Sequence, residues 1–224
     1  MLQGPRIIPN HFSCFAKVEG NTIIFDFNSC LVFIGEKGIE LFGKHFQLKN
    51  EDQELIYKLL IYTIRDEENA QKHKLNLQKG IMLTGPVGCG KTSLMKLIRF
   101  FQPQQEVFML KSCREISFEF IAKGFEVIHK YSSRAPDSTP QKAICFDDLG
   151  TEQNLKYFGN ECNVMAEILL SRYDQFIAHG ILTHLTTNLS ATEIETCYGN
   201  RVRSRMREML NVLSFNKESK DKRT

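Results

Sequence analysis

The stretch GPVGCGKT, residues 85–92, follows the apolar run IMLT at 81–84 and precedes a segment with the apolar spacing of a helix. Gly85, Gly88 and Gly90 have no Cβ, so the backbone of this stretch can come close to a bound anion. A helix that begins here would also present its N-terminal N–H groups to that anion. The sequence therefore predicts a phosphate-binding loop between a strand and a helix.

The residues of this loop have separate predicted roles. We expect Lys91 to reach the β- and γ-phosphates of ATP and the Thr92 hydroxyl to bind Mg²⁺. The predicted nucleotide contacts are Gly85, Pro86, Val87, Gly88, Cys89, Gly90, Lys91, Thr92 and Ser93. The alternative is a glycine-rich turn with a chance lysine, and the flanking strand and helix argue against it.

Short apolar runs recur along the chain, and longer amphipathic stretches separate them. The runs are IMLT at 81–84, VFML at 107–110, AICF at 143–146, ILTHL at 181–185 and NVLSF at 211–215. The amphipathic stretches are clearest at 91–101, 114–131 and 161–179. Continuous apolar runs are typical of buried parallel strands. The predicted fold class is therefore α/β, with a five-stranded parallel sheet and helices on both faces.

Two carboxylates follow the third of these runs. Asp147 and Asp148 come directly after AICF, so a buried strand would deliver them to the edge of the sheet where nucleotides bind. We expect Asp147 to hold the magnesium shell and Asp148 to polarise the attacking water. In many P-loop sites the second carboxylate is a glutamate. Because aspartate is one methylene shorter, we expect slower hydrolysis or another means of positioning the water. The alternative is a strand end that faces solvent.

The fourth run continues into Thr186, Thr187 and Asn188. A polar side chain at this place can contact the attacking water or the γ-phosphate, and we assign that role to Asn188. A role as a turn residue is the alternative, because Ser190 is placed to cap a following helix.

Three arginines lie close together in GNRVRSRM, residues 199–206. On a helix, Arg201 and Arg205 share a face and Arg203 points away. We favour Arg205 as a finger that enters the active site of a neighbouring subunit, with Arg201 as a supporting contact. A solvated basic face or a contact to nucleic-acid phosphate is the alternative.

The chain is expected to have two parts. Residues 1–48 contain short apolar runs, TIIFDF and CLVFI, among glycines, and we expect a small strand-and-turn appendage there. Residues 49–224 would form the P-loop domain, beginning with a helix from Asn50 to near Arg65. The loop SSRAPDSTPQ, at 132–141, is the main break in the order of strands and helices.

The composition is that of a globular protein, with 42% hydrophobic and 25% charged residues among 224. No apolar run approaches the roughly 20 residues that a membrane-spanning helix needs, and the N-terminus lacks a signal-peptide pattern. We expect a soluble, cytoplasmic protein with no membrane partner. The seven cysteines are scattered and form no CxxC pair, so we expect reduced thiols and neither a zinc site nor a disulfide framework. The net charge of +3 is too small to indicate a nucleic-acid-binding protein by itself.

In this order the motifs resemble those of AAA+ ATPases, and more narrowly the DnaC/DnaI-type replicative helicase loaders and their IstB-like relatives. The resemblance covers about residues 43–223. It depends most on FDDLGTE after the third strand, TTN at the fourth and YGNRVRSRM. It implies a P-loop sheet of the ASCE/AAA+ type, and we expect the helical lid to be minimal or absent. It also implies a second sensor in the terminal stretch, where Lys220, Lys222 and Arg223 are candidates.

The resemblance implies a function as well. The chain would be an ATPase that uses ATP and Mg²⁺ to open or escort a hexameric replicative helicase onto single-stranded DNA. Nucleotide-dependent self-association through Arg205 would accompany this. An IstB-like transposition ATPase acting on duplex DNA is the alternative. A P-loop kinase for small molecules is a third reading, but such kinases have no need of an arginine presented to a neighbouring subunit.

Loaders place single-strand contacts in the region that corresponds to residues 111–125. This segment combines Lys111, Arg114 and Lys123 with Phe118, Phe120 and Phe125. Base stacking on aromatic rings with phosphate neutralisation is suitable chemistry for sequence-tolerant binding. For each phenylalanine, packing in the core is the more frequent role.

Overall fold

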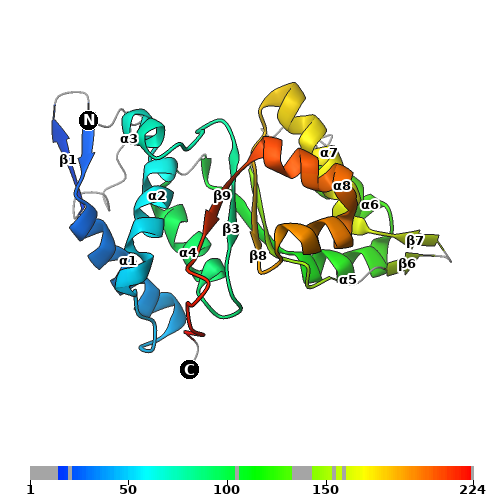
Figure 1. Ribbon diagram of the computed structural model, residues 1–224, viewed down its shortest axis with the longest axis horizontal. Coiled ribbons are helices and arrows are strands. Elements are labelled where there is room, and N and C mark those ends of the chain that lie inside the picture. Colours follow the sequence, from blue (N-terminus) through cyan, green and yellow to red (C-terminus); the bar gives the residue numbers. More distant parts are fainter. Residues whose placement is uncertain are drawn as a thin grey trace. The chain divides into compact units, whose positions relative to one another are not determined.

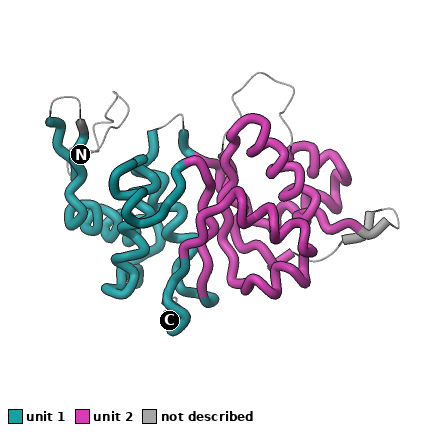
Figure 2. Tube along the Cα trace, turned by 45° about the horizontal axis from the view of Figure 1, so that its top comes forward, with its two compact units in different colours: residues 1–77, 86–107, 214–224 teal, residues 78–85, 108–213 magenta. Residues whose placement is uncertain are grey.

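The computed structural model describes residues 15–19, 22–103, 106–132, 143–152, 155–157 and 160–222. The chain forms two compact units (Figure 2). The first consists of residues 1–77, 86–107 and 214–224, and the second of residues 78–85 and 108–213. A domain boundary near residue 48 stays a prediction. Of the predicted loop at 132–141, only Ser132 belongs to the described residues, and it ends a helix.

The second unit is built on a five-stranded sheet. Its strands are β4 (Met109–Ser112), β5 (Ile144–Leu149), β8 (Thr183–Thr187), β3 (Gly80–Thr84) and β9 (Leu210–Ser214), in this spatial order. Figure 1 labels β8, β3 and β9 of this sheet. The sheet is parallel, which confirms the five predicted strands and the fold class. The order places β8 between β3, which leads into the glycine-rich loop, and β5, which carries the carboxylates.

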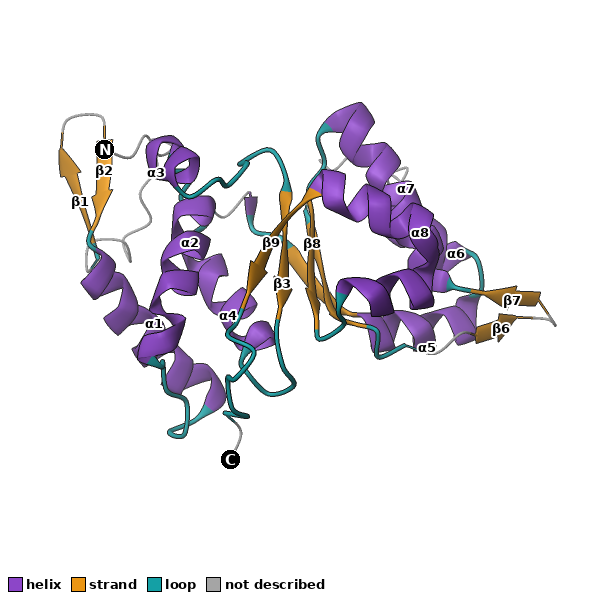
Figure 3. Ribbon diagram, viewed as in Figure 1, coloured by secondary structure: helices purple, strands orange, loops and turns teal. Residues whose placement is uncertain are grey.

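Helices α5 (Cys113–Lys123), α6 (Glu126–Ser132), α7 (Val164–His179) and α8 (Ala191–Met209) belong to the same unit (Figure 3). Their apolar faces share one core with the sheet, as Phe120, Phe146, Ile168 and Met206 illustrate. The single helix predicted at 114–131 is divided, because Gly124 takes φ +62 and ends α5. The predicted cap of α8 is confirmed, since Ser190 and Glu193 form a reciprocal capping box. The hairpin of β6 (Leu155–Tyr157) and β7 (Asn160–Cys162) has no counterpart in the prediction.

The first unit contains mainly helices. Its elements are the hairpin β1 (Ala16–Glu19) and β2 (Thr22–Phe25), helices α1 (Phe27–Phe42), α2 (Gln53–Thr63), α3 (Glu67–Lys72) and α4 (Lys91–Ile98), and the 3₁₀ turns η2 (Asn50–Asp52) and η3 (Arg99–Phe101). The helix predicted from Asn50 begins with η2 and continues as α2. The helix predicted at 91–101 is α4 followed by η3.

One prediction for this unit was wrong. The run CLVFI at 30–34 lies in helix α1 and is not a strand. The Asp26 side chain accepts a hydrogen bond from the Ser29 N–H at 2.7 Å and caps the helix, and Cys30, Ile34 and Gly38 form a buried stripe at a spacing of four. A short apolar run does not distinguish a strand from a buried helix segment, and here the cap and the spacing decide.

Within the part of the chain that the structure describes, no helix is both long enough and apolar enough to cross a bilayer.

Candidate nucleotide-binding site

The glycine-rich loop connects β3 to the first turn of α4. Gly88 has φ +77 and Gly90 has φ +104, which are conformations that side chains disfavour. Gly90 is the N-cap of α4, so Lys91, Thr92 and Ser93 form the first turn, where backbone N–H groups have no partner within the helix. A helix N-terminus of this kind attracts phosphate.

Lys91 is folded over the loop. Its side chain is buried, and Nζ donates a hydrogen bond to the Pro86 carbonyl at 2.8 Å. The side chain of Cys89, within the loop, is buried. Burial raises the pKa of its thiol, which therefore stays protonated at neutral pH. The lysine ammonium is thus already at the loop to which a phosphate would bind.

The carboxylates lie in the second unit, at a β-bulge in β5. Phe146 pairs with Leu185 of β8 and Leu149 pairs with Thr187, so two residues of β5 face the single residue Thr186. An extra residue in one strand changes the direction of the side chains that follow it. At this bulge, Asp147 is buried and its neighbour Asp148 is exposed.

The Thr186 hydroxyl connects both residues of the bulge. It donates to Asp147 Oδ1 at 2.6 Å and accepts from the Asp148 N–H at 2.8 Å. Thr186 is fully buried, so this hydroxyl is held in place. Asp148 has φ +56, in a region that aspartate and asparagine tolerate better than most residues. The backbone therefore offers a reason why this position carries aspartate.

Asn188 follows β8 directly and is exposed. The threonine before it has a structural role, because Thr187 Oγ1 donates to the Leu149 carbonyl at 2.7 Å and accepts from the Leu189 N–H at 3.1 Å. Of the three polar residues at the end of this strand, Thr186 contacts the Asp147 carboxylate and the Asp148 backbone. The sequence pattern TTN does not distinguish among the three, since only the bulge makes Thr186 face two residues.

A contact that the sequence did not predict joins two of its motifs. The Tyr198 hydroxyl donates to Glu152, which also accepts from the Gly150 N–H at 2.9 Å. Burial and the Glu152 carboxylate raise the pKa of Tyr198, so the phenol keeps its proton and remains a donor. The segment that follows β5 is thereby connected to α8, which carries the arginines.

The three arginines have different surroundings. Helix α8 has a kink at Gly199, just before them. Arg205 lies against α7, with its guanidinium 4.7 Å from the centre of the Tyr173 ring and 3.6 Å from the Asp174 carboxylate. Arg203 forms an ion pair with Glu195 of its own helix, and Arg201 is exposed.

The predicted DNA segment is divided between core and surface. Phe120 is fully buried in the core, so of its two predicted roles core packing is confirmed and base stacking is excluded. Phe118 and Phe125 are exposed, and the Arg114 guanidinium lies 5.5 Å from the centre of the Phe118 ring.

Lys111, from the same segment, is engaged by carboxylates, with Nζ 2.8 Å from Glu115 and 2.7 Å from Glu119. Burial acts to raise the pKa of Glu119, but hydrogen bonds from Lys111, Lys130 and Tyr131 lower it to about 2. Glu119 therefore stays ionised and balances the charge of Lys111. Arg114 and Lys123 remain exposed cations in the segment that carries Phe118 and Phe125.

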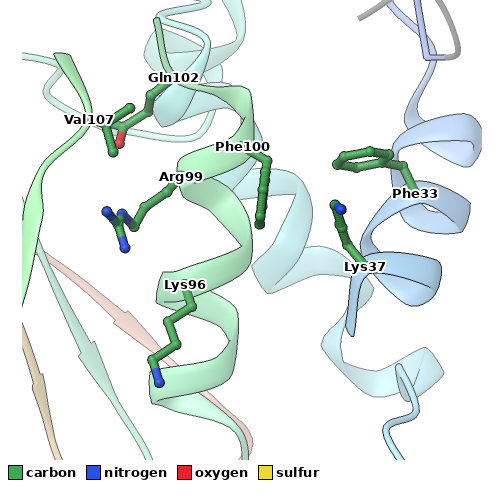
Figure 4. A pocket seen from close by; sticks show the side chains of 7 residues that line it. All are labelled: Phe33, Lys37, Lys96, Arg99, Phe100, Gln102 and Val107. Atoms are coloured by element: carbon green, nitrogen blue, oxygen red, sulfur yellow. The ribbon is translucent and has the colours of Figure 1, made fainter. Parts of the chain in front are cut away.

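A pocket of about 620 Å³ lies in the first unit, next to α1 and the end of α4 (Figure 4). It is lined by Phe33, Lys37, Lys96, Arg99, Phe100, Gln102 and Val107. Figure 4 shows Phe33 and Lys37 of α1 facing Phe100. Lys37 Nζ lies 5.4 Å from the centre of the Phe100 ring and also pairs with Glu40, and Lys96 lies over the ring of Phe42. These cation–π contacts help to pack α1 against α4 and η3, so we assign the pocket residues a structural role.

No family model matches the chain, and no curated protein matches its sequence. Solved structures do match. A protein named as a primosome component from Streptococcus pyogenes serotype M3 has a TM-score of 0.52 at 17% identity, over 77% of this chain and 83% of that chain. The DnaC helicase loader has a TM-score of 0.50 at 17% identity, over 77% of this chain and 95% of that chain.

The chain has the AAA+ fold. At this level of identity the likeness concerns the fold.

Proposed function

We propose that this chain is an AAA+ ATPase that helps to place a hexameric replicative helicase on single-stranded DNA. One observation carries the proposal: at the β5 bulge Asp147 is buried, Asp148 is exposed, and the Thr186 hydroxyl contacts the carboxylate of the first and the backbone N–H of the second. Two carboxylates with such different surroundings suit two different tasks in ATP hydrolysis. The glycine-rich loop before α4 supplies the phosphate-binding part.

Each site residue then has a task. The loop from Gly85 to Ser93 holds the phosphates, and Lys91 leaves the Pro86 carbonyl to contact them. Asp148 activates the attacking water, and Asn188 contacts that water or the γ-phosphate. Arg205, with Arg201 in support, acts on the nucleotide of a neighbouring subunit.

Magnesium fits the residues present. Asp147 is a buried carboxylate with a neutral hydroxyl as hydrogen-bond partner, and Thr92 offers a hydroxyl in the first turn of α4. Mg²⁺ prefers such hard oxygen ligands and is usually bound by one or two protein groups together with substrate phosphates. When bound, it would offset the charge that develops on the phosphates.

The DNA contact is proposed for the exposed part of the 111–125 segment. Phe118 and Phe125 offer ring faces, and Arg114 and Lys123 offer cations. This combination suits a single strand, whose bases are free to stack. An IstB-like action on duplex DNA is the second candidate, because a duplex needs only the cations.

The nucleotide site is tested by Lys91→Ala, with Lys96→Ala as the matched control on the same helix. A charge-assisted hydrogen bond contributes enough that its loss should weaken ATP binding about 10- to 100-fold. Lys96 is exposed and lies over the Phe42 ring, so its loss should leave ATP affinity unchanged. Titration calorimetry with ATP and Mg²⁺ measures both. Equal affinity of Lys91→Ala and the parent would refute the assignment of the loop.

The partner is tested by affinity capture from the host lysate with ATP and Mg²⁺, followed by mass spectrometry. A replicative helicase that is retained by the parent and lost with Lys91→Ala supports the loader. ATPase activity should then be stimulated by single-stranded more than by duplex DNA. Stimulation by duplex DNA with filament formation, and no helicase in the eluate, would support the IstB-like alternative instead.

A further inference from the structure

The C-terminal segment of the chain returns to the glycine-rich loop. After β9, a turn begins at Asn216: its side chain accepts from the Glu218 N–H at 3.1 Å and its carbonyl from the Ser219 N–H at 3.0 Å. Ser219 is buried, and its hydroxyl donates to Glu51 at 3.2 Å. A segment rich in charged residues is thus held in one conformation within the first unit.

Lys222 holds this segment in place through several contacts, one of which is to the loop. Its backbone N–H donates to the Gly88 carbonyl at 3.0 Å. Its ammonium forms an ion pair with the buried Asp52 and lies 5.0 Å from the centre of the Phe215 ring. A buried carboxylate that lost this partner would be left with an uncompensated charge, so the contact is strongly favoured.

Asp221 brings a negative charge to the same loop. A Cβ placed on Gly88 would lie 2.1 Å from the carboxyl carbon of Asp221, so this carboxylate packs directly against the loop backbone. The loop attracts phosphate through its N–H groups and the helix N-terminus. Although Asp221 is exposed, its carboxylate beside the loop repels an incoming phosphate.

We propose that residues 216–222 form a latch that weakens nucleotide binding while it is closed. Lys222 holds the latch on Gly88 and Asp52, and Asp221 supplies the repulsion. ATP then binds better when the segment moves away, so a partner that takes up the C-terminal segment would load the chain with nucleotide. This inference rests on the proposed nucleotide site.

The test measures ATP affinity of the full chain by titration calorimetry at low and high salt. Asp221→Asn removes the charge at nearly constant size, and Glu218→Gln removes an exposed carboxylate of the same segment as the matched control. Asp221→Asn should bind ATP about threefold to tenfold more tightly, less so at high salt, while Glu218→Gln stays unchanged. Lys222→Met should also bind more tightly, and hydrogen exchange of residues 216–222 should become faster.

The other outcomes are distinct. Weaker binding by Lys222→Met would mean that the segment supports the loop, and the latch would be wrong. An equal gain for Asp221→Asn and Glu218→Gln would reduce the effect to net charge and would also overturn it. If the parent binds ATP and neither Asp221→Asn nor Lys222→Met binds it better, the latch alone fails. If the parent and all variants fail to bind ATP, the proposed nucleotide site fails and the latch with it.

Discussion

Thr186 is the residue whose hydroxyl contacts both Asp147 and Asp148. Its hydroxyl has one proton, which it gives to Asp147, and it accepts the N–H of Asp148. Both functions of the hydroxyl are therefore used in one place. A methyl group of similar size could do neither.

Thr186→Val should therefore lower ATP turnover about tenfold or more while ATP affinity stays close to that of the parent, since the phosphate-binding loop is unchanged. Thr187→Val is the matched control: this neighbour is equally buried and also has two hydrogen bonds, but to Leu149 and Leu189. Both variants should lose about 1–3 kcal/mol of unfolding free energy. Steady-state hydrolysis and urea unfolding measure the two effects. Equal turnover of the two variants would remove Thr186 from the site.

At the scale of elements, β3 and β8 are joined by a buried histidine. The Ile81 N–H of β3 donates to His184 Nδ1 at 3.1 Å, and the ring lies 4.8 Å from that of Phe108. Burial, with the positive charge of Arg172, lowers the pKa of His184 to about 3 from an ordinary value of 6.5. The folded protein therefore keeps this ring neutral.

Because of His184, the free energy of unfolding should fall in mild acid. The unfolded chain protonates the histidine below pH 6.5 and the folded chain only near pH 3, so stability is lost as the pH falls through that window. The loss from this group amounts to about 2 kcal/mol at pH 5. His184→Asn keeps an acceptor for Ile81 and does not titrate, so its unfolding free energy should fall less between pH 7 and pH 5. Equal losses in urea unfolding would contradict the prediction.

The segment after β5 and helix α8 should respond to the loss of one hydroxyl. Tyr198→Phe removes the hydrogen bond to Glu152 and should cost about 1.5–3 kcal/mol of stability, because the acceptor is charged and the tyrosine is buried. Tyr173→Phe removes a hydroxyl bonded to Glu208 on the surface and should cost less. Thermal unfolding compares the two. A larger effect for Tyr173→Phe would show that the Glu152 contact does not hold the two elements together.

The elements that the sequence predicted well are those with a local signal. The five strands were predicted from short apolar runs, four of them continuous, and Ser190 is followed at the right distance by Glu193. The bulge in β5 has no such signal, because it is defined by the pairing with β8, whose nearest paired residue lies 38 residues further along the chain. The burial of Phe120 likewise depends on which face of α5 meets the sheet. The loop residues Lys91 and Thr92 were predictable because their spacing alone defines their chemistry.

At the scale of the whole molecule, the proposed role of Arg205 predicts that ATP turnover needs more than one copy of the chain. In the single chain its guanidinium contacts Tyr173 and Asp174 of α7, so it would have to exchange these contacts for those of a neighbouring subunit. Arg201 is exposed and needs no such exchange.

Turnover per chain should rise with protein concentration, and Arg205→Ala should abolish the rise while sparing ATP binding. Arg201→Ala should weaken the rise. Asp174→Ala is the matched control, because it breaks the same ion pair but keeps the guanidinium, and it should preserve the rise. Hydrolysis rates across a dilution series measure this. If Asp174→Ala behaves like Arg205→Ala, the arginine acts within its own chain.

The bulge in β5 makes the carboxylate pair a matter of chain length as well as of residue type. Replacing Asp148 by any other residue leaves two residues opposite Thr186, whereas deleting it would leave one. Phe146 and Leu149 would then still pair with Leu185 and Thr187 in an unbroken ladder. The loss of a single codon would thus silence the site and keep the strand in register, a change that a comparison of folds alone would not detect.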